Sequence, residues 1–466
     1  MTSALLTSFL ALMATGLPVA LAMAIACLIY VMASGNIPDY VVIHRMVNGI
    51  DSFPLLAVPF FILAGNLMNT AGITNRIYNF ALALVGWMKG GLGHVNIVGS
   101  MIFSGMSGTA IADAAGLGTI EIKAMSDHGY PIEFSVGVTA ASATLGPIIP
   151  PSLPFVIYGM MANVSIGQLF LGGVIPGIVM SIFMMATVAY FAHKRGYGAD
   201  SVLSWSRLSR AALEIVVVLA FPFAIWLMTL IDISVNWAVG IAFAILLALD
   251  WIFDFAAVMA LMAPVILIGG MTLGWFTPTE AAVAAVIWAL FLGLVRYRSL
   301  TWRMLIKASM DTIETTATVL LIVAAASIFG WLLTVTHVAD AIASGVLAIT
   351  DKPAVFLLLA NILMLFVGCF LETTAAILIL VPILMPIVLK LGIDPVHFGL
   401  IMVLNLMIGL LHPPLGMVLF VLARVANLSV ERTTVAILPW LIPLLLSLVA
   451  VTYVPEITLW LPRQFF

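Results

Sequence analysis

The sequence predicts an all-α polytopic membrane protein, and two observations lead to that prediction. Hydrophobic residues make up 64% of the 466 residues and charged residues only 8%, whereas a soluble globular chain is nearer half apolar and a quarter charged. A soluble protein of this length could not bury so much apolar surface. The apolar residues also occur in runs of about 20, the length that crosses a membrane as a helix.

These apolar runs follow one another along the chain. The first begins at residue 5, is too long for the apolar part of a signal peptide, and has no Lys or Arg before it. We therefore expect an uncleaved first helix. The expected spans are 5–33, 53–68, 134–161, 166–192, 213–231, 237–255, 258–273, 281–295, 316–335, 354–370, 397–411 and 435–454.

Charge and cysteine content exclude several classes of function. A formal net charge of −3 argues against a nucleic-acid partner. The two cysteines, Cys27 and Cys369, lie in apolar runs and are expected to pack rather than form a disulfide or bind a metal. The most basic loops, at 193–195 and 296–307, are expected on the cytoplasmic side of a lipid bilayer by the positive-inside rule.

Two apolar stretches are too broken to cross the membrane as simple helices. Residues 97–120 contain five glycines, and residues 373–389 contain Pro382 and Pro386. Irregular backbone is tolerated at membrane depth only inside protein or facing a wet cavity. Transporters build their binding sites from such breaks.

A faint internal repeat relates the two halves of the chain at an offset of 263 residues. The pattern G-x-x-x-P-P at 146–151 recurs at 409–414, and F-x-G at 103–105 recurs at 366–368. Two halves that each carry a broken helix indicate a transporter site.

Small residues and hydroxyls are concentrated in the first broken stretch. Gly105 and Gly108 let the backbone turn and expose carbonyls, and the hydroxyls of Ser107 and Thr109 add oxygen ligands. Such a tip suits a hard monovalent cation, or a carboxylate held by helix N-termini. Close helix packing through small residues is the alternative, but Asp113, an intramembrane acid, favours a functional site.

A second polar cluster follows in the next apolar segment. Ser142, Thr144 and Gly146 precede Pro150 and Pro151. A proline frees a carbonyl one turn back in a helix, and two prolines beside a glycine unwind it. Either a bound cation or the neighbouring hydroxyls can satisfy the freed groups, and both interpretations stay open.

The second half repeats this chemistry. Gly368 is followed by the carboxylate of Glu372 and the hydroxyls of Thr373 and Thr374. A carboxylate beside two hydroxyls at membrane depth is expected to bind an ion or substrate.

The last broken helix brings further candidates. Asn405, Gly409, His412 and Pro413 supply an amide, a backbone break and an imidazole. A lone His at this depth is more often a hydrogen-bonded packing residue than a proton relay. Arg424 is expected either to bind a substrate carboxylate or to extend to the interface from a helix end.

Asp250 and Asp254 sit four residues apart on one helical face, so a membrane-embedded enzyme with paired carboxylates is an alternative. Trp251 and Phe253 beside them are more typical of a membrane interface. The sequence has no H-E-x-x-H, no Gly-rich phosphate loop and no zinc-like Cys/His spacing. Nothing therefore indicates nucleotide hydrolysis, which leaves an ion gradient to drive transport.

Five motifs stand out along the chain. They are SFPLLAVPFFILAGN at 52–66, SG at 107–108 leading to DAA at 113–115, GPIIPPS at 146–152, FTPTEAA at 276–282 and GIDPVHFG at 392–399. Together they resemble the large permease (M) subunit of tripartite ATP-independent periplasmic (TRAP) transporters, and the resemblance runs from about residue 5 to the end of the chain.

The resemblance implies an elevator-type transporter with inverted repeats, whose moving domain holds two re-entrant hairpins. The hairpins match about 99–121 and 362–389, and the broken helices 134–161 and 397–425 lie beside them.

The same resemblance divides the chain into parts. The first repeat half is expected at 1–210 and the second at 258–466. Residues 211–257 form an expected extra apolar helix pair, because this stretch is usually shorter in the family. The pair could replace contacts with a partner subunit.

The resemblance further implies sodium-coupled symport of a small organic acid across the bacterial inner (cytoplasmic) membrane. It implies two partners, a small four-helix membrane subunit and a periplasmic substrate-binding protein. The HPP sequence at 412–414 resembles C4-dicarboxylate members, so a C4-dicarboxylate is the first expected substrate and a sugar acid the next. An elevator-type anion transporter without a binding protein is the alternative. Backbone and hydroxyl oxygens would bind Na⁺ near Ser107, Thr109, Gly146, Gly368, Thr373 and Gly409.

Overall fold

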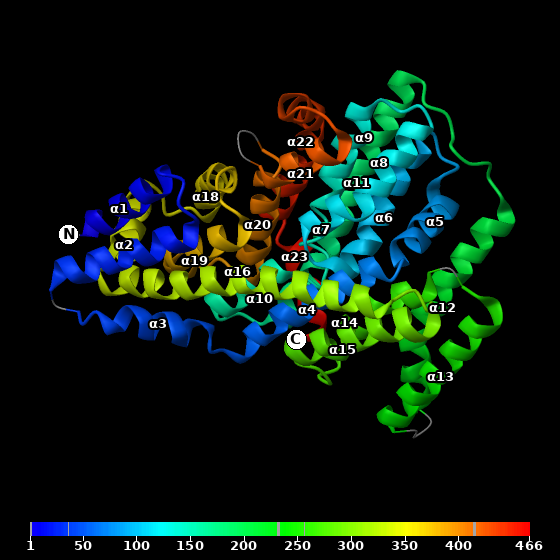
Figure 1. Ribbon diagram of the computed structural model, residues 1–466, viewed down its shortest axis with the longest axis horizontal. Helices are drawn as coiled ribbons and strands as arrows, with labels where there is room; N and C mark the ends of the chain where they lie inside the picture. Colours follow the sequence, from blue (N-terminus) through cyan, green and yellow to red (C-terminus); the bar gives the residue numbers. More distant parts are fainter. Residues whose placement is uncertain (1, 36, 231–233, 256, 413–415) are drawn as a thin grey trace.

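The computed structural model describes residues 2–35, 37–230, 234–255, 257–412 and 416–466, and in these ranges the chain is helical, without a strand (Figure 1). Eight of the described helices are long and apolar enough to cross a membrane. The predicted all-α polytopic class is therefore confirmed. The eight are Phe53–Thr70, Ile166–Arg195, Trp205–Leu230, Val235–Phe253, Pro278–Arg296, Trp302–Val335, Thr373–Lys390 and Val430–Tyr453.

The longest helix, α16 (Trp302–Val335), runs across the middle of the molecule (Figure 1). At the N-terminal end, α1 (Thr2–Ala14) packs on α2 (Val19–Ser34), and both α2 and α3 (Tyr40–Ile50) pack on α16. The outer face of α3 carries large exposed apolar side chains. That face suits contact with lipid.

The first hairpin follows two helices that pack beside it. Its three helical pieces are separated by a turn at Gly108 and by Gly116, which joins the second piece to the third. The elements are η1 (Phe53–Leu56), α4 (Ala57–Thr70), α5 (Ile73–Val85), and the hairpin itself, α6 (Gly91–Ser107), α7 (Ala110–Ala115) and α8 (Leu117–Asp127).

The predicted broken helix comes next. It consists of α9 (Ile132–Ala143) and α10 (Leu153–Ala162), and residues 144–152 between them are not helical. The long α11 (Ile166–Arg195) then returns across the protein and ends in the basic residues of its last turn.

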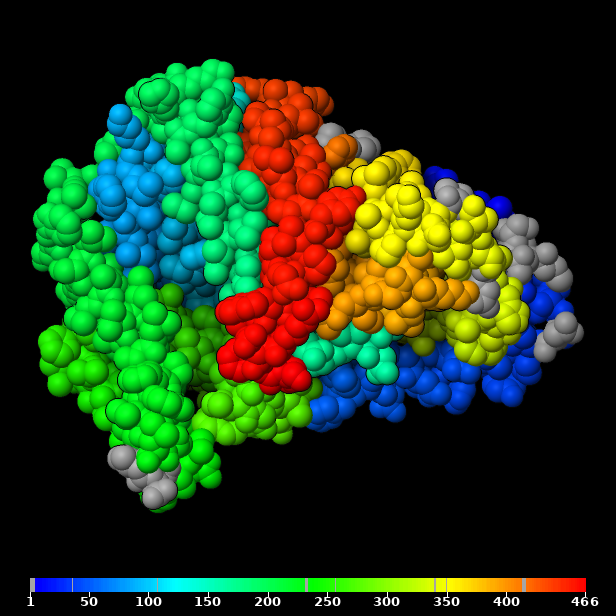
Figure 2. All heavy atoms as spheres, turned by 180° about the vertical axis from the view of Figure 1, so that it is seen from behind, coloured from blue at the N-terminus to red at the C-terminus, as the bar shows by residue number. Residues whose placement is uncertain are grey.

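The second half builds the same arrangement. Seen from behind, the C-terminal helices run down the middle of the molecule, between the first-half helices and the second hairpin (Figure 2). The elements are α17 (Val338–Ile349), α18 (Pro353–Gly368), α19 (Thr373–Lys390), α20 (Pro395–Gly409), α21 (Met417–Ala426), α22 (Val430–Tyr453), α23 (Glu456–Leu459) and α24 (Pro462–Phe465).

Helix boundaries repeat at the offset seen in the sequence. Helix α9 begins at Ile132 and α20 begins at Pro395, which is 263 residues later. The starts of α6 and α18, of α10 and α21, and of α11 and α22 match within one residue of that offset. This agreement supports the internal repeat, while the division at 1–210, 211–257 and 258–466 stays a prediction.

Two helices between the halves lie at the periphery (Figure 1). In α12 (Trp205–Leu230) and α13 (Val235–Phe253), 22% of the most apolar window is buried, against 44–72% in the other six candidate spans. They connect to α14 (Val258–Thr272), α15 (Pro278–Leu290) and the π-helical η2 (Phe291–Arg296). The pair therefore exposes most of its surface, either to lipid or to another membrane protein.

Candidate functional site

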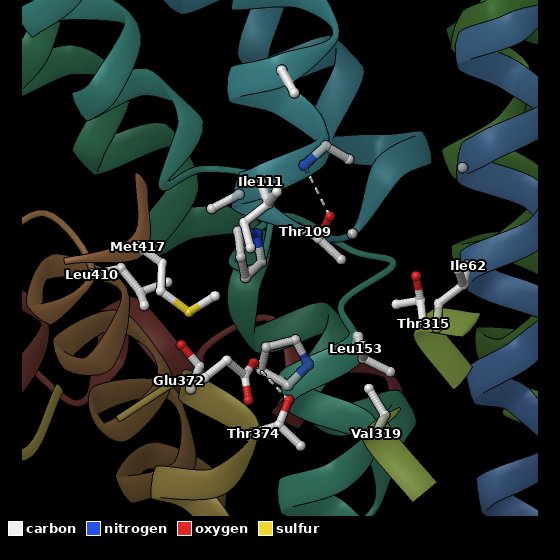
Figure 3. Close-up of a pocket in the computed structure, with 18 of the residues that line it drawn as sticks. Ile62, Thr109, Ile111, Leu153, Thr315, Val319, Glu372, Thr374, Leu410 and Met417 are labelled. Carbon is white, nitrogen blue, oxygen red and sulfur yellow. Dashed lines mark hydrogen bonds between the residues drawn. The ribbon is translucent and has the colours of Figure 1, made fainter. Parts of the chain in front are cut away.

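A cavity of about 480 Å³ lies where the helix breaks of the two halves meet (Figure 3). Gly108 and Thr109 line it from the tip of the first hairpin, and Glu372, Thr373 and Thr374 line it from the tip of the second. The starts of α10 and α21 and one face each of α4 and α16 complete the wall. The volume is in the range of small-molecule sites in proteins.

The tip of the first hairpin packs directly against the break between α9 and α10. Gly108 has φ +64°, and a Cβ there would lie 2.8 Å from the carbonyl oxygen of Pro151. A Cβ on Gly146 would lie 2.9 Å from the carbonyl oxygen of Thr109. Both positions therefore need glycine. The Thr109 hydroxyl accepts a hydrogen bond from Ala112 N at 3.3 Å and begins α7.

Helix ends of both polarities meet around the cavity. Among the described elements, α7 begins there after its cap Thr109, α10 after its cap Ser152, α19 at Thr373 and α21 at Met417. Their free N–H groups provide positive potential for an anion. Helices α6, α9, α18 and α20 end beside the same breaks, and the negative ends of their dipoles favour a cation there.

Glu372 is the N-cap of α19. Its carboxylate accepts hydrogen bonds from the Thr374 hydroxyl at 2.9 Å and from Ala375 N at 3.3 Å. The hydroxyl oxygen of the neighbouring Thr373 is buried without a hydrogen-bond partner among the described residues. A buried polar atom normally has a partner, so the unpaired hydroxyl beside a carboxylate fits a bound cation.

The second half also brings two helices into backbone contact. A Cβ on Gly409 would lie 2.7 Å from Gly368 Cα, and one on Gly368 would lie 3.1 Å from Gly409 Cα. The contact holds the C-terminal ends of α18 and α20 together. It corresponds to the contact of Gly146 with the first hairpin tip.

Three predicted site residues lie behind the cavity and do not line it. Ser142 donates a hydrogen bond to Asn96 Oδ1 at 2.6 Å and so joins α9 to α6. Asn405 donates to Asn361 Oδ1 at 2.7 Å and joins α20 to α18. Thr144 donates to a carbonyl of its own turn. All three side chains are engaged in hydrogen bonds within the protein, and their role in binding an ion or substrate stays a prediction.

Other predicted residues lie away from the cavity. Gly105 faces α14, where a Cβ would lie 3.1 Å from Pro264 Cγ. Arg424 is exposed in the last turn of α21 and does not line the cavity, so its contact with a substrate carboxylate stays a prediction.

The remaining predicted positions surround the two proline breaks. Pro150 is buried, but it does not line the cavity. His412 is exposed, with Nδ1 3.3 Å from Cys369 Sγ. Pro413 lies outside the described residues, as does the side chain of Ser107.

Sequence reasoning missed the wall that faces the hairpins. Asn66 and Asn69 of α4 and Thr315 of α16 line this side of the cavity. Asn66 donates a hydrogen bond to Thr312 Oγ1 at 3.0 Å, which joins α4 to α16. A Cβ on Gly116 would lie 3.0 Å from the Asn69 side chain. The sequence did contain one signal for this wall, because Asn66 ends the motif at 52–66.

The charge of the cavity is unusual for an anion site. Among the described residues that line it, Glu372 is the one ionisable side chain, and none is Lys, Arg or His. The other polar groups are hydroxyls and amides. A carboxylate therefore faces the space that a ligand would occupy, with no basic side chain opposite it.

The paired carboxylates of α13 are used in ion pairs outside the cavity. Arg296 contacts Asp250 and Asp254, each at 2.6 Å, and Arg210 donates to the carbonyl of Asp254 at 2.9 Å. The hydrogen bond from Arg296 holds the pKa of Asp254 below its usual range. These contacts attach α13 to the end of η2, and they leave no free pair of acids for an enzyme mechanism.

Comparison with known proteins decides the family. A family model described as "Tripartite ATP-independent periplasmic transporter, DctM component" matches residues 6–457. The chain belongs to this TRAP permease family. The resemblance noted in the sequence is thereby confirmed, and the permease is a transporter subunit, not an enzyme.

Curated relatives match the permease over most of its length. The large permease protein SiaM of a sialic acid TRAP transporter from Vibrio cholerae is 42% identical and covers 98% of this chain and 97% of its own. The C4-dicarboxylate permease protein DctM of Rhodobacter capsulatus is 32% identical, with 97% of each chain covered. The isethionate permease protein DctMQ of Oleidesulfovibrio alaskensis is 36% identical over 96% of this chain and 64% of its own.

Two solved structures share the fold at low sequence identity. The YdaH transporter of Alcanivorax borkumensis superposes with a TM-score of 0.58 at 15% identity, covering 87% of this chain and 86% of its own. MtrF of Neisseria gonorrhoeae gives 0.55 at 11% identity, covering 88% and 83%. The first is titled a transporter and the second is placed in a class of antimetabolite efflux pumps, and their similarity to the permease is one of fold.

Proposed function

We propose that the permease is the carrier of a sodium-coupled symporter that brings a small organic acid across the bacterial inner membrane. The observation that carries this proposal is the charge of the cavity. Helix N-termini provide positive potential for an anion, but Glu372 is the one ionisable side chain among the described lining residues. An acid that enters beside this carboxylate needs a compensating cation, and a coupling ion supplies it.

The residues at the two breaks fit Na⁺. At the second hairpin, Glu372 and the unpaired Thr373 hydroxyl lie beside the carbonyl ends that Gly368 and Gly409 bring together. At the first hairpin, the carbonyl oxygen of Thr109 lies against Gly146, and Ser107, whose side chain lies outside the described residues, stays in the predicted set. A bound Na⁺ would supply positive charge next to the substrate. The oxygen atoms of these residues would bind the ion and fix its position.

The names of the relatives support the proposed substrate class. SiaM and the Haemophilus influenzae permease protein SiaT, at 42% and 39% identity, bear sialic acid names. Less identical relatives are named for isethionate, C4-dicarboxylates and 2,3-diketo-L-gulonate. Every one of these names is an organic acid. We therefore propose an organic acid, with a sugar acid tested before the C4-dicarboxylate that the sequence first indicated.

Two partners belong to the same proposal. A small four-helix membrane subunit and a periplasmic binding protein would complete the tripartite assembly that the family description names. The DctMQ relative extends well beyond the 64% of its length that matches here, which leaves room for a second membrane component in the same chain. The peripheral α12–α13 pair could take over part of that contact.

An elevator movement accounts for access to both sides of the membrane. The cavity lies between the hairpins and broken helices on one side and α4 and α16 on the other. We propose that the hairpins move with their broken helices, and that α4 and α16 stay fixed.

The test is uptake into proteoliposomes that contain the permease and both partners. Labelled sialic acid, or succinate as a C4-dicarboxylate, should accumulate only under an inward sodium gradient. Equal accumulation under a proton gradient without sodium would refute sodium coupling. Uptake that needs no binding protein would favour the carrier acting without one.

A further inference from the structure

A second buried polar cluster lies inside the first hairpin, apart from the cavity. Asp113 of α7 and Glu121 of α8 are each 1% exposed. Neither residue lines the cavity, and the proposed sodium site does not use them. They lie close enough for two negative charges to repel each other.

The neutral members of the cluster are engaged with one another. Asn96 donates hydrogen bonds to Glu121 Oε2 at 2.7 Å and to Thr139 Oγ1 at 2.8 Å, so both its amide protons are used. Ser142 donates to the Asn96 carbonyl oxygen at 2.6 Å, and Ser100 donates to Ser142 at 3.1 Å.

Two carboxylate oxygens stay without partners in this network. Asp113 Oδ2 and Glu121 Oε1 are buried and have no hydrogen-bond partner among the described residues. The backbone comes close to the second of them, because a Cβ on Gly99 would lie 2.8 Å from Glu121 Oε1. An ionised carboxylate with an unpaired buried oxygen is destabilised, because burial removes the water that would otherwise stabilise its charge.

Among the described residues, no positively charged side chain is buried beside this pair. Lys123 of α8 is exposed, and Arg76 of α5 lies over the ring of Tyr297. The titratable group facing Glu121 from α5 is Tyr78, and α6 contributes the buried His94, whose ring nitrogens have no partner among the described residues. Helix α9 contributes hydroxyls. Helix α21 also contacts α7 and α8, but its Arg424 is exposed.

We propose that Glu121 forms a proton-binding site inside the first hairpin that is occupied in this conformation. A proton neutralises the buried acid and adds the donor that the network lacks. A divalent metal ion fits less well, because Ca²⁺ and Mg²⁺ take six or more oxygen ligands, whereas two oxygens of this cluster have no partner among the described residues. The permease thus holds a proton site separate from its sodium site, within the same moving element.

The test is infrared spectroscopy of the purified full-length permease at neutral pH. A protonated carboxylic acid has its own carbonyl stretching band, which shifts in heavy water. We expect this band in the wild type and its loss or clear reduction in Glu121→Gln, whose amide mimics the neutral acid. Asp113→Asn provides a second variant if Glu121→Gln does not fold. Glu456→Gln, at an exposed position, is the control and should leave the band unchanged.

Thermal unfolding gives an independent readout. Because the folded protein would bind more protons than the unfolded chain above acidic pH, the wild-type melting temperature should fall as the pH rises. Glu121→Gln should flatten that fall, whereas Glu456→Gln should not. A wild type without the band, or a band that persists in both cluster variants, would overturn the proposal. So would a sodium- or lithium-dependent rise in melting temperature that Glu121→Gln removes, because it would assign the cluster to a metal ion.

Discussion

At the scale of single residues, Glu372 combines two tasks. Its oxygens cap the start of α19 through Thr374 and Ala375, and the same carboxylate faces the cavity. Glutamine keeps a carbonyl oxygen for the cap and removes the charge. Substitution therefore separates the structural task from the electrostatic one.

Glu372→Gln should raise the sodium half-saturation of uptake by about tenfold, equivalent to ~1.4 kcal/mol of lost ion binding. Without the negative charge, the site also loses its need for a cation, so substrate binding should depend less on sodium. Both quantities can be measured in proteoliposomes, with Glu456→Gln as the exposed control. An unchanged sodium half-saturation in correctly folded Glu372→Gln would mean that Glu372 only caps the helix and does not bind sodium.

The sequence indicated some of these residues and not others for physical reasons. Glu372 and Thr109 were predictable, because a carboxylate or hydroxyl beside a helix break is costly in lipid without a role. The asparagines of α4 were not assigned, since polar residues on an otherwise regular helix do not reveal which neighbour they face. Ser142 and Asn405 have the same chemistry as site residues, and only the three-dimensional contacts place them behind the cavity.

At the scale of elements, the two halves use the same kind of joint between a hairpin and a broken helix. Gly146 meets the backbone of Thr109, and Gly409 meets the backbone of Gly368. The glycines found by the internal repeat are therefore joints that allow backbones to touch. Gly105, which the repeat matched to Gly368, faces α14 instead. The 263-residue offset therefore predicted where the helices begin, but it did not predict which residues each glycine contacts.

Gly146→Ala and Gly409→Ala should each reduce uptake by tenfold or more at unchanged expression. The added Cβ would lie 2.9 Å from a carbonyl oxygen in the first and 2.7 Å from a Cα in the second, so backbone must shift. Overpacking of this kind costs about 1–3 kcal/mol. Gly269→Ala is the matched control, because no atom lies within 4 Å of its added Cβ. Wild-type uptake in both variants would show that the joints tolerate displacement.

Arg296 anchors the C-terminal end of α13 in the peripheral pair α12–α13. Arg296 binds the buried Asp250 and the exposed Asp254, whose side chains are 2% and 73% accessible. Removing one partner of a buried pair leaves an unpaired charge, whereas an exposed pair contributes little. The sequence had shown the two acids on one helical face, but it gave no sign of the arginine that they share.

Arg296→Gln should therefore lower the melting temperature strongly, by the equivalent of about 3–5 kcal/mol. Asp254→Asn should cost at most about 1 kcal/mol. The double variant Arg296→Gln with Asp250→Asn should recover part of the loss, since it removes the stranded charge. Thermal unfolding of purified protein measures all three. Equal effects of Arg296→Gln and Asp254→Asn would mean that the pair with Asp250 is not the anchor.

At the scale of the whole molecule, composition alone predicted a membrane protein, and apolar runs predicted most of its helices. They could not predict how the helices divide into moving and fixed groups, because every group is apolar and α-helical. That division depends on contacts between residues far apart in the chain. The interface between α16 and α19 is the place where it can be tested, since α16 lies in the proposed fixed group and α19 belongs to the second hairpin.

A disulfide across this interface should stop transport. A Cβ at Gly330 of α16 would lie 3.8 Å from the Cβ of Pro382 of α19, which matches the usual Cβ separation of about 3.8 Å in disulfides. The variant Gly330→Cys with Pro382→Cys should lose sodium-driven uptake on oxidation and regain it on reduction. Each single variant, treated in the same way, controls for the native Cys27 and Cys369, which are buried. Full uptake in protein with a verified cross-link would show that α16 and α19 move as one body, and the fixed and moving groups would then have to be divided elsewhere.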